Sequence, residues 1–469
     1  MNHASTTAPL IGPPSATLTH EFRALVRLAA PLVAANLLQM AVYAVDVIFV
    51  ARLGTVEFAA ATLGVFLFSL IMWALASMVA AGAPIIAAEL GARKHAVREV
   101  RRTFRMSMWL AVVVTIPFLV LLAHGEAVFR LAGQNPVVAA RSGAFLDILL
   151  FALIPGIMAA AMRSAAAALG RPGWTMVVTI MALGLGILTN WLFVFGHGGF
   201  PAMGLEGSAL SSVVTMTAMA LAYAAILAFD RKLRRYRLFG RWWRPEWPRL
   251  RQIAVVGAPI ALLMTFEGGL FGGAALLMGL IGVEAVAAHA VALNIAAVAF
   301  QIPFGVAQAA TIRVGLGYGA RDAAWIGRAG TAALTVGVGA MAFTATLIWA
   351  MPRLFISAYI DVDAVENARV VPLAIQYLAV AAAFQLFDGA QAVGGGLLRG
   401  LQDTRVPMFI ALFGYWVIGF GTSVLLAFRF DLAGLGVWIG LAVGLAAVTA
   451  LFLWRWHVRE TIGLVPARV

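Results

Sequence analysis

The sequence contains no cysteine and only two lysines, Lys94 and Lys232. The absence of cysteine excludes disulfides, cysteine-ligated zinc and thiol chemistry. Neither lysine follows the glycine spacing of a phosphate-binding P-loop, so a pump driven by ATP would need a partner chain. Zinc-protease HExxH and serine-hydrolase GxSxG elements are also missing, and we therefore do not expect an enzyme.

Charged residues are scarce along the whole chain. Of its 469 residues, 11% are charged and 63% are hydrophobic, and the mean hydropathy is +0.95. A soluble domain carries about 25% charged residues, so this chain has too few polar side chains to cover a water-facing surface. We expect the lipid bilayer to surround most of it. The net charge of +13 does not indicate a nucleic-acid partner, because the arginines lie at the ends of apolar segments.

Long apolar runs dominate what remains. A helix needs about 20 apolar residues to cross a bilayer, and twelve runs meet that length, which predicts an all-α polytopic membrane protein. The predicted spans are 24–52, 58–90, 104–123, 138–161, 173–196, 205–229, 253–281, 285–313, 328–350, 371–397, 405–427 and 432–455. The polar, proline-rich residues 1–23 lack the pattern of a cleaved signal peptide, and we expect a disordered tail there.

The basic residues are distributed unevenly between the connections. The even-numbered connections hold 22 of them and the odd-numbered connections hold 6. Basic connections stay on the cytoplasmic side of a membrane. The pattern therefore predicts that both termini of this multi-pass protein are cytoplasmic. We expect its location to be a bacterial inner (plasma) membrane.

The two halves of the chain are related in sequence. Ala30-Pro31-Leu32 matches Ala258-Pro259-Ile260, and Gly91-Ala92-Arg93 matches Gly319-Ala320-Arg321 at the same offset along the chain. Leu169 and Met176 match Leu401 and Met408 at a slightly larger offset. Six spans in each half predict two six-helix lobes related by pseudo-two-fold symmetry. The predicted parts are a cytoplasmic tail at 1–23, an N-lobe at 24–229, a basic cytoplasmic linker at 230–252, a C-lobe at 253–456 and a second cytoplasmic tail at 457–469.

Three acidic residues lie deep in the predicted spans: Asp46, Glu267 and Asp388. A charged carboxylate at the bilayer centre costs about 2.5–3.5 kcal/mol. Each should therefore face a polar cavity, bind a cation or carry a proton. The alternative is that each only holds helices together. No basic residue lies at comparable depth in the predicted spans, which leaves bound cations or protons as the natural counter-charges.

The repeat places these acids at different depths in the two halves. Asp46 lies about four helical turns after Pro31, whereas Glu267 lies about two turns after the equivalent Pro259. The difference of two turns is about 10 Å along the axis, on a similar face. Asp388 lies in the same half as Glu267, so these two carboxylates can share a cavity and titrate together.

Several uncharged polar residues in the spans are weaker candidates for a polar lining. For each of them, simple hydrogen bonding between helices is at least as good an explanation. They are Asn36, Gln39 and Tyr43 in the first span, Asn190 in the fifth, and Asn294 and Gln301 in the eighth.

Three stretches resemble the MATE family of multidrug and toxic-compound extrusion transporters, and within it the NorM-like branch. They are VAAHAVALNIAAVAFQIPFGVAQAATIRVGLGYGARD (286–322), LLRGLQDTRVPM (397–408) and LAAPLVAANLLQMAVYAVDVIFVARLG (28–54). The resemblance implies a twelve-helix fold with a central cavity and secondary active antiport. Organic, often cationic, compounds would leave the cell in exchange for Na⁺ or H⁺, with no further cofactor. We expect the protein to be a monomer.

The same resemblance assigns roles to individual residues. Asp46, Glu267 and Asp388 match the family's acids in the first, seventh and tenth spans, and Asn190 matches its asparagine in the fifth. Two positions depart from the family pattern: Gly186 and Phe384 stand where relatives often carry a polar residue and a tyrosine. Both departures remove possible ion ligands.

The expected mechanism is alternating access. Three alternatives remain open at this level. A flippase for lipid-linked sugars has the same superfamily fold and would favour a basic cavity. A membrane enzyme would need a clustered nucleophile, base or metal. A passive channel would not transport uphill.

Overall fold

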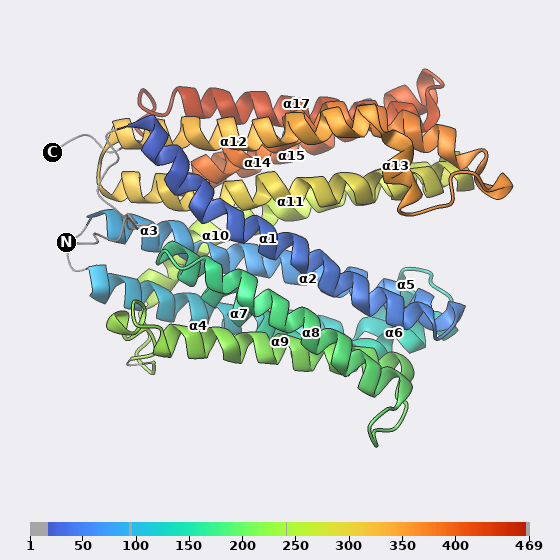
Figure 1. The fold of residues 1–469 in the computed structure, drawn as a ribbon, viewed down its shortest axis with the longest axis horizontal. Helices are drawn as coiled ribbons and strands as arrows, with labels where there is room; N and C mark the ends of the chain where they lie inside the picture. Colours follow the sequence, from blue (N-terminus) through green and yellow to red (C-terminus); the bar gives the residue numbers. More distant parts are fainter. Residues whose placement is uncertain (1–16, 93–95, 241, 466–469) are drawn as a thin grey trace, which may run out of the picture. The chain divides into compact units, whose positions relative to one another are not determined.

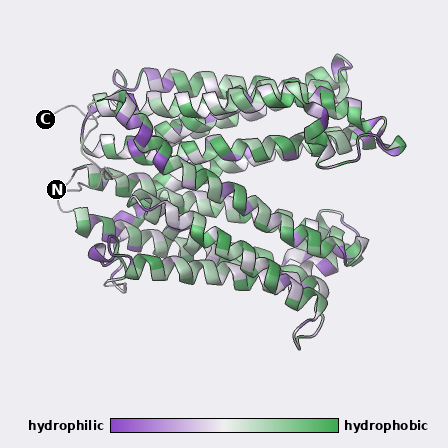
Figure 2. Ribbon diagram, viewed as in Figure 1, coloured by the Kyte–Doolittle hydropathy of each residue, from purple (hydrophilic) through white to green (hydrophobic). Residues whose placement is uncertain are grey.

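The computed structural model describes residues 17–92, 96–240 and 242–465. The ends of both predicted tails, 1–16 and 466–469, lie outside the described residues, as do Arg93 and Lys94. Within the described part, twelve helical segments are long and apolar enough to cross a membrane. Figure 2 shows hydrophobic residues along the helices and hydrophilic residues gathered mainly near their ends. All twelve predicted spans correspond to helical segments.

By their internal contacts the residues divide into two units, which we call the N-unit and the C-unit. The N-unit is Ala34–Ala261, and the C-unit comprises the described residues of Met1–Val33 and Leu262–Val469. Two helices, α1 (Leu18–Ala51) and α10 (Trp247–Ile281), contribute to both units (Figure 1).

The other elements belong to one unit each. Those of the N-unit are α2 (Thr55–Ala80), α3 (Gly82–Ala92), α4 (Ala96–Ala123), α5 (Gly125–Leu131), α6 (Pro136–Leu149), η1 (Leu150–Ala152), α7 (Leu153–Ala168), α8 (Gly173–Phe195), α9 (Gly204–Phe229) and η2 (Arg234–Tyr236). Those of the C-unit are α11 (Val283–Gly319), α12 (Ala323–Ala350), α13 (Pro352–Ser357), η3 (Val365–Asn367), α14 (Val370–Gly400), α15 (Arg405–Leu412), η4 (Phe413–Phe420), α16 (Gly421–Val424), η5 (Leu425–Arg429) and α17 (Ala433–His457). Of these, η4 and η5 are π-helical.

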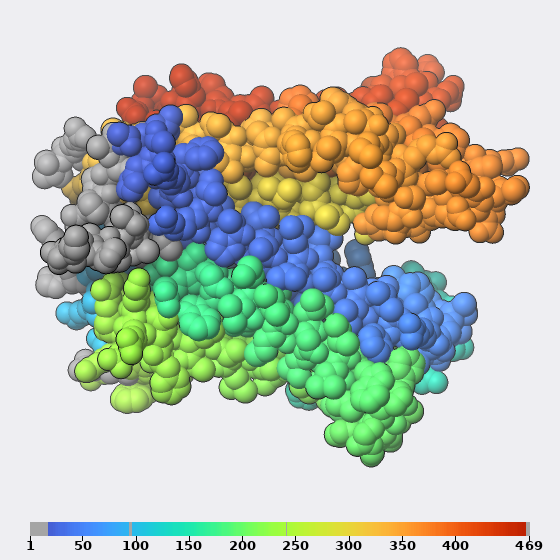
Figure 3. All heavy atoms as spheres, viewed as in Figure 1, coloured from blue at the N-terminus to red at the C-terminus, as the bar shows by residue number. Residues whose placement is uncertain are grey.

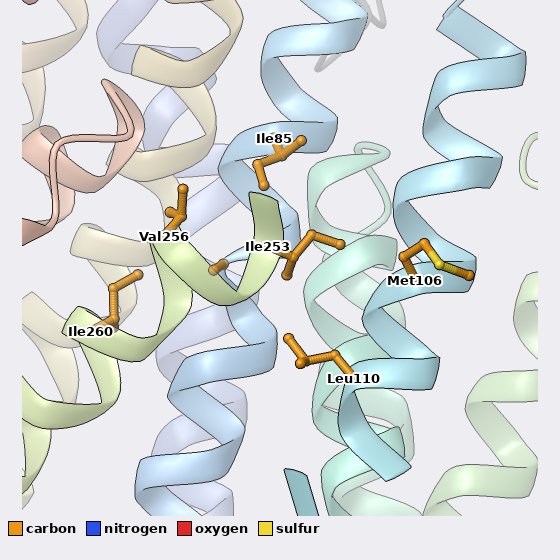
Figure 4. Close-up of a cluster of buried hydrophobic side chains, with 7 residues drawn as sticks. Ile85, Met106, Leu110, Ile253, Val256 and Ile260 are labelled. Atoms are coloured by element: carbon orange, nitrogen blue, oxygen red, sulfur yellow. The ribbon is translucent and has the colours of Figure 1, made fainter. Parts of the chain in front are cut away.

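The division into units differs from the lobe boundary predicted in the linker 230–252. It falls inside α1 and α10, two residues after Pro31 and Pro259. Figure 4 shows the physical reason for α10: Ile253, Val256 and Ile260 pack in one buried cluster with side chains of α3 and α4. The spacing of three and four residues places these three on one face of α10, so the start of this helix packs within the N-unit.

Charged residues anchor the same two helix starts. Glu21 on α1 is fully buried, and both its oxygens accept hydrogen bonds from Arg313 on α11 at 2.6 Å. Trp325 on α12 donates to the same carboxylate at 3.1 Å. On α10, Arg249 pairs with Glu89 of α3 at 3.0 Å and with Glu99 of α4. The disordered tail predicted for residues 1–23 is therefore wrong from Leu18 onward, where α1 has already begun.

The backbone repeats in the register that the sequence indicates. Gly54 immediately precedes α2, and Gly282 immediately precedes α11. The two glycines are related by the same offset as Pro31 and Pro259. Both have a positive φ, of 125° and 157° respectively. A second pair of positions behaves in the same way. Gly170 and Gln402 immediately follow the matched residues Leu169 and Leu401, and their backbones have positive φ angles of 76° and 61°. Such conformations are uncommon outside glycine, so their recurrence at equivalent positions supports the internal repeat.

Small residues let the helices of the C-unit approach closely. A Cβ atom added at Gly396 of α14 would lie 2.6 Å from the carbonyl oxygen of Ala307 on α11. Thr311 of α11 donates to the carbonyl of Gly396 at 2.8 Å across the same contact. Membrane helices associate through such small-residue contacts and interhelical hydrogen bonds.

The segment from α13 through η3 extends past the end of α12 in Figure 3.

Candidate functional site

A cavity of about 420 Å³ lies in the N-unit, between α1, α2, α6, α8 and α9. Its lining is mainly apolar and includes several aromatic rings, and Asp46 is the one charged residue among the described lining residues. Tyr43 and Val50 flank Asp46 at helical spacing, which turns this face of α1 toward the cavity. The lining residues used below are Tyr43, Asp46, Phe58, Phe66, Phe145, Gly186, Ser208, Ser212, Thr215 and Met216.

The Asp46 carboxylate is held by two other helices. Asn190 on α8 donates from Nδ2 to Oδ1 at 2.7 Å, and Ser212 on α9 donates from its hydroxyl to Oδ2 at 3.3 Å. The same Asn190 amide donates to the carbonyl of Gly186 at 2.9 Å. The structure therefore brings Asp46 and Asn190 together. A Cβ atom added at Gly186 would have the Thr215 hydroxyl at 3.9 Å as its nearest neighbour, so there is room for a small side chain at this departure from the family pattern.

The polar residues of α9 that line the cavity are not among the candidates that we predicted from the sequence. Ser208, Ser212 and Thr215 line the cavity at spacings of four and three residues, which is one helix face. Ser211, the neighbour of Ser212, bonds to Thr189 of α8 at 2.6 Å. A polar stripe at helical spacing in an apolar span was the signal that could have identified them.

Asn36, Gln39 and Tyr43 differ in their surroundings. Tyr43 lines the cavity and is 39% exposed. Asn36 and Gln39 are not among the described residues that line the cavity. Their side-chain amide nitrogens have no hydrogen-bond partner within the described part of the chain. Gln39 and Asp46 stand two helical turns apart, which is about 10 Å along the axis, so a shared face alone does not bring the two side chains together.

A second acidic group lies in the C-unit. Glu267 of α10 and Asp388 of α14 are 8% and 5% exposed, and their carboxyl groups interact electrostatically. Tyr415, in the π-helical segment η4, interacts with both. Glu267 and Asp388 therefore lie near enough for their charges to interact, and we call them, with Tyr415, the acidic cluster of the C-unit.

Two further polar residues of this cluster, Gln391 and Tyr415, are not among the candidates that we predicted from the sequence. Gln391 of α14 donates from Nε2 to the Tyr415 hydroxyl at 2.6 Å. Within the described part of the chain, Asp388 Oδ1 and Gln391 Oε1 have no hydrogen-bond partner. Gln391 follows Asp388 by three residues, so its position on the same helix face was readable in the sequence. Tyr415 was not, because a tyrosine in an apolar span resembles a core aromatic residue.

One basic residue interacts with this cluster from outside the predicted tenth span. Arg399 of α14 interacts electrostatically with Glu267 and Tyr415, and its Nε donates to the carbonyl of Gly395 at 3.1 Å. The predicted span ended at residue 397, whereas α14 continues to Gly400. The long arginine side chain reaches back along its own helix from there.

Asn294 and Gln301 satisfy their amides on their own helix. Asn294 donates to the carbonyl of Ala290 at 2.8 Å and Gln301 to that of Ala297 at 3.2 Å. No described hydrogen bond joins either residue to Glu267 or Asp388. Phe384, at the second departure, is buried against Trp438 with ring centroids 5.6 Å apart. The phenol of the cluster comes instead from Tyr415.

Both groups of residues are rich in oxygen acceptors. Hard cations prefer carboxylate, carbonyl and hydroxyl oxygens. No group of three or more His, Cys, Asp or Glu side chains suited to a metal ion occurs among the described residues. Carboxyl groups in such surroundings can take up and release a proton or bind a cation.

The MatE family model matches residues 31–192 and again 259–425, and the two matches begin at Pro31 and Pro259, in the register of the repeat. A probable multidrug resistance protein NorM from Mesorhizobium japonicum is 46% identical, covering 94% of this chain and 95% of that protein. The multidrug resistance protein NorM from Burkholderia vietnamiensis is 36% identical and covers 100% of both chains.

Solved structures with the same fold are more distant in sequence. The eukaryotic MATE transporter AtDTX14 superposes with a TM-score of 0.84 at 20% identity, covering 96% of this chain and 99% of that one. A MOP superfamily transporter from Pyrococcus furiosus gives 0.86 at 18% identity, covering 98% of this chain and 100% of that one. With its repeated family match and its twelve candidate spans, this chain is a multi-pass membrane protein and belongs to the MatE family.

Proposed function

We propose that this protein is a secondary active multidrug exporter that exchanges organic compounds, often cationic, for Na⁺ or H⁺ by alternating access. The observation that carries the proposal is the pair Glu267 and Asp388, buried in the C-unit, with Asp388 Oδ1 lacking a hydrogen-bond partner among the described residues. A buried carboxylate needs a compensating charge or proton. An ion that binds there in one conformation and leaves in another supplies that compensation.

The cavity of the N-unit suits the other part of the exchange. Its volume of about 420 Å³ lies within the 300–1,000 Å³ typical of small-molecule sites. Aromatic side chains in the lining suit a flat cation, and a methionine adds an adaptable contact. These residues are Tyr43, Phe58, Phe66, Phe145 and Met216. Asp46 supplies one negative charge. The relatives' printed names, multidrug resistance protein, agree with such a site.

A lipid-linked-sugar flippase receives less support. Pyrophosphate would require basic side chains in its cavity, and the described lining of the N-unit cavity contains no lysine or arginine. We therefore place organic cations first among the substrates.

The driving force follows from charge movement. One elementary charge crossing 100 mV is worth about 2.3 kcal/mol, so a small number of ions per substrate sustains accumulation. In this proposal the protein works as a monomer in the inner membrane, with both termini in the cytoplasm, as the distribution of basic residues predicts.

Proteoliposomes loaded with a fluorescent organic cation test the proposal. A Na⁺ gradient and a pH gradient are imposed separately, and movement of the dye against its own gradient is followed. Uphill movement with one gradient supports antiport and names the ion. Dye that only equilibrates under both gradients would leave a passive channel as the better description.

A further inference from the structure

Four arginines occupy one face at the start of α4. Arg98, Arg101, Arg102 and Arg105 follow one another at spacings of three, one and three residues, so their side chains share a face. The helix has 28 residues, about 42 Å at 1.5 Å per residue, against about 30 Å of hydrocarbon. Roughly two turns of α4 therefore extend beyond the lipid tails, which is the length that carries Arg98, Arg101 and Arg102; Arg105 follows three residues later.

The segment that leads into α10 forms the opposite wall of a cavity. Glu246 pairs with both Arg102 and Arg105, and the indole of Trp109 donates to the carbonyl of Trp242 at 3.1 Å. These bonds hold the segment against the arginine face. The enclosed volume is about 450 Å³, and all of it lies within the N-unit.

The lining of this cavity is strongly basic. It contains six arginines, the four on α4 with Arg244 and Arg249, and one carboxylate, Glu246. Arg249 is engaged by Glu89 and Glu99, and Glu246 engages Arg102 and Arg105. Among the described residues, no ion pair involves Arg98, Arg101 or Arg244. Three guanidinium groups of the described lining are thus available to a bound anion.

The surroundings of the cavity match a membrane surface. Trp243 and Trp247, on either side of Arg244, are 74% and 61% exposed. Exposed tryptophans are enriched at the level of the lipid headgroups, where the ring is apolar and its N–H is hydrated. A phosphate bound among the arginines would therefore lie at the depth of the bilayer's own headgroups.

We propose that this cavity binds the phosphate group of an anionic glycerophospholipid. Guanidinium groups recognise phosphate oxygens through paired, charge-assisted hydrogen bonds. Basic pockets at the cytoplasmic ends of membrane helices are suited to such headgroups. The bound lipid links the start of α4 to the segment before α10, which Glu246 already joins. Free phosphate shares this chemistry, and the experiment separates the two sources.

The purified full-length protein is titrated with tail-labelled phosphatidylglycerol in neutral detergent. The competitors are unlabelled phosphatidylglycerol, phosphatidylcholine, glycerol 3-phosphate and inorganic phosphate. The test variant combines Arg98→Gln, Arg101→Gln and Arg244→Gln. The matched control combines Arg231→Gln, Lys232→Gln and Arg234→Gln, which removes the same charge but outside the cavity.

The test variant should bind phosphatidylglycerol roughly 100-fold more weakly, since each basic residue near an anionic headgroup contributes about a factor of five. The control should change by less than about threefold because screened charges outside the site act weakly. Competition by phosphatidylglycerol alone identifies a lipid site. Competition by glycerol 3-phosphate or phosphate as well identifies the phosphate as sufficient.

Equal losses in the test variant and the control would overturn the proposal, as would full competition by phosphatidylcholine. Thermal unfolding without lipid shows whether each variant is folded. If the triple variant is not, the single changes at the exposed Arg98 and Arg244 carry the test, with Arg231→Gln as their control. Binding by both single variants as tight as that of the parent would then contradict the site.

Discussion

Glu21 and Arg249 stand at the same position of the internal repeat, in the register that relates Pro31 to Pro259, and anchor their helices with opposite charges. Glu21 holds the start of α1 to Arg313, and Arg249 holds the start of α10 to Glu89 and Glu99. If α1 took the place of α10, its carboxylate would face two carboxylates. The reversed charges therefore disfavour an exchange of the two helix starts.

The same reversal occurs at a second repeated position. Arg171 pairs with Asp230 in the N-unit, and Asp403, the equivalent of Arg171 in the second half, pairs with Arg455 at 2.5 Å in the C-unit. Both pairs join the loop after the fourth span of a half to the end of its sixth span. The helices of the two halves are equivalent, whereas the ion pairs that hold them have the acidic and the basic residue in opposite places.

Replacing Glu21 by glutamine should destabilise the protein strongly. The change removes the carboxylate charge that faces Arg313 in a pair whose side chains are 0% and 3% exposed. Breaking a buried ion pair costs about 3–5 kcal/mol, which thermal or denaturant unfolding in detergent measures. Glu460→Gln is the control, because that carboxylate is 60% exposed and surface pairs contribute about 0–1 kcal/mol. Equal losses in the two variants would show that burial of the Glu21 pair adds nothing.

Glu267→Gln and Asp388→Asn should each abolish efflux of an organic cation while expression stays normal. Both changes keep the side-chain shape and remove the charge that, in the proposed mechanism, takes up the coupling ion. Dye efflux from cells or proteoliposomes measures the effect. Asp147→Asn is the control, since Asp147 is exposed on α6 and does not line the N-unit cavity. Unimpaired efflux in both test variants would exclude these acids from coupling.

Asn190→Ala should impair efflux more than Ser212→Ala. Asn190 donates to Asp46 at 2.7 Å, whereas Ser212 donates at 3.3 Å, and a hydrogen bond to a charged group contributes about 1.5–3 kcal/mol when its geometry is good. The measurement is the concentration of dye that gives half-maximal efflux. Thr179→Ala on the same helix is the control, because the hydroxyl of Thr179 donates to the carbonyl of Thr175 and lies outside the cavity lining. The reverse order of Asn190 and Ser212 would contradict the geometry.

Asp230, at the end of α9, should make stability depend on acidity. Burial raises the pKa of its carboxyl, but hydrogen bonds from Arg171, Trp174 and the Lys232 N–H outweigh this and hold the pKa below its ordinary value of 3.8. A depressed pKa stabilises the folded state above the unfolded value, and this contribution is lost as the pH falls through the folded value. The stability difference between the parent and Asp230→Asn should therefore be full at neutral pH and shrink below about pH 4. A difference that stays constant down to about pH 3 would contradict this linkage.

Hydropathy predicted the spans closely because lipid imposes a local rule. Every backbone polar group in the bilayer must bond within its own helix, so a run of about 20 apolar residues suffices to identify a span. The predicted span 371–397 became α14, Val370–Gly400. The rule fails at the ends of the helices, because a charged residue there is not always exposed to solvent. Glu21 reads as part of a polar tail, but it is buried against Arg313 from the other half of the chain.

The acids of the candidate site were predicted from sequence, since a carboxylate in an apolar run is conspicuous whatever surrounds it. Their partners were not. Ser212 of α9 reaches Asp46 of α1, and Tyr415 meets Gln391 from another helix. The sequence by itself determined the helices, the repeat and the three acids, because each depends on residues close together in the chain or on a comparison of the two halves. Only the tertiary structure decided which oxygens gather around each acid and which helix start packs in which unit, because those depend on distances between segments that are far apart in sequence.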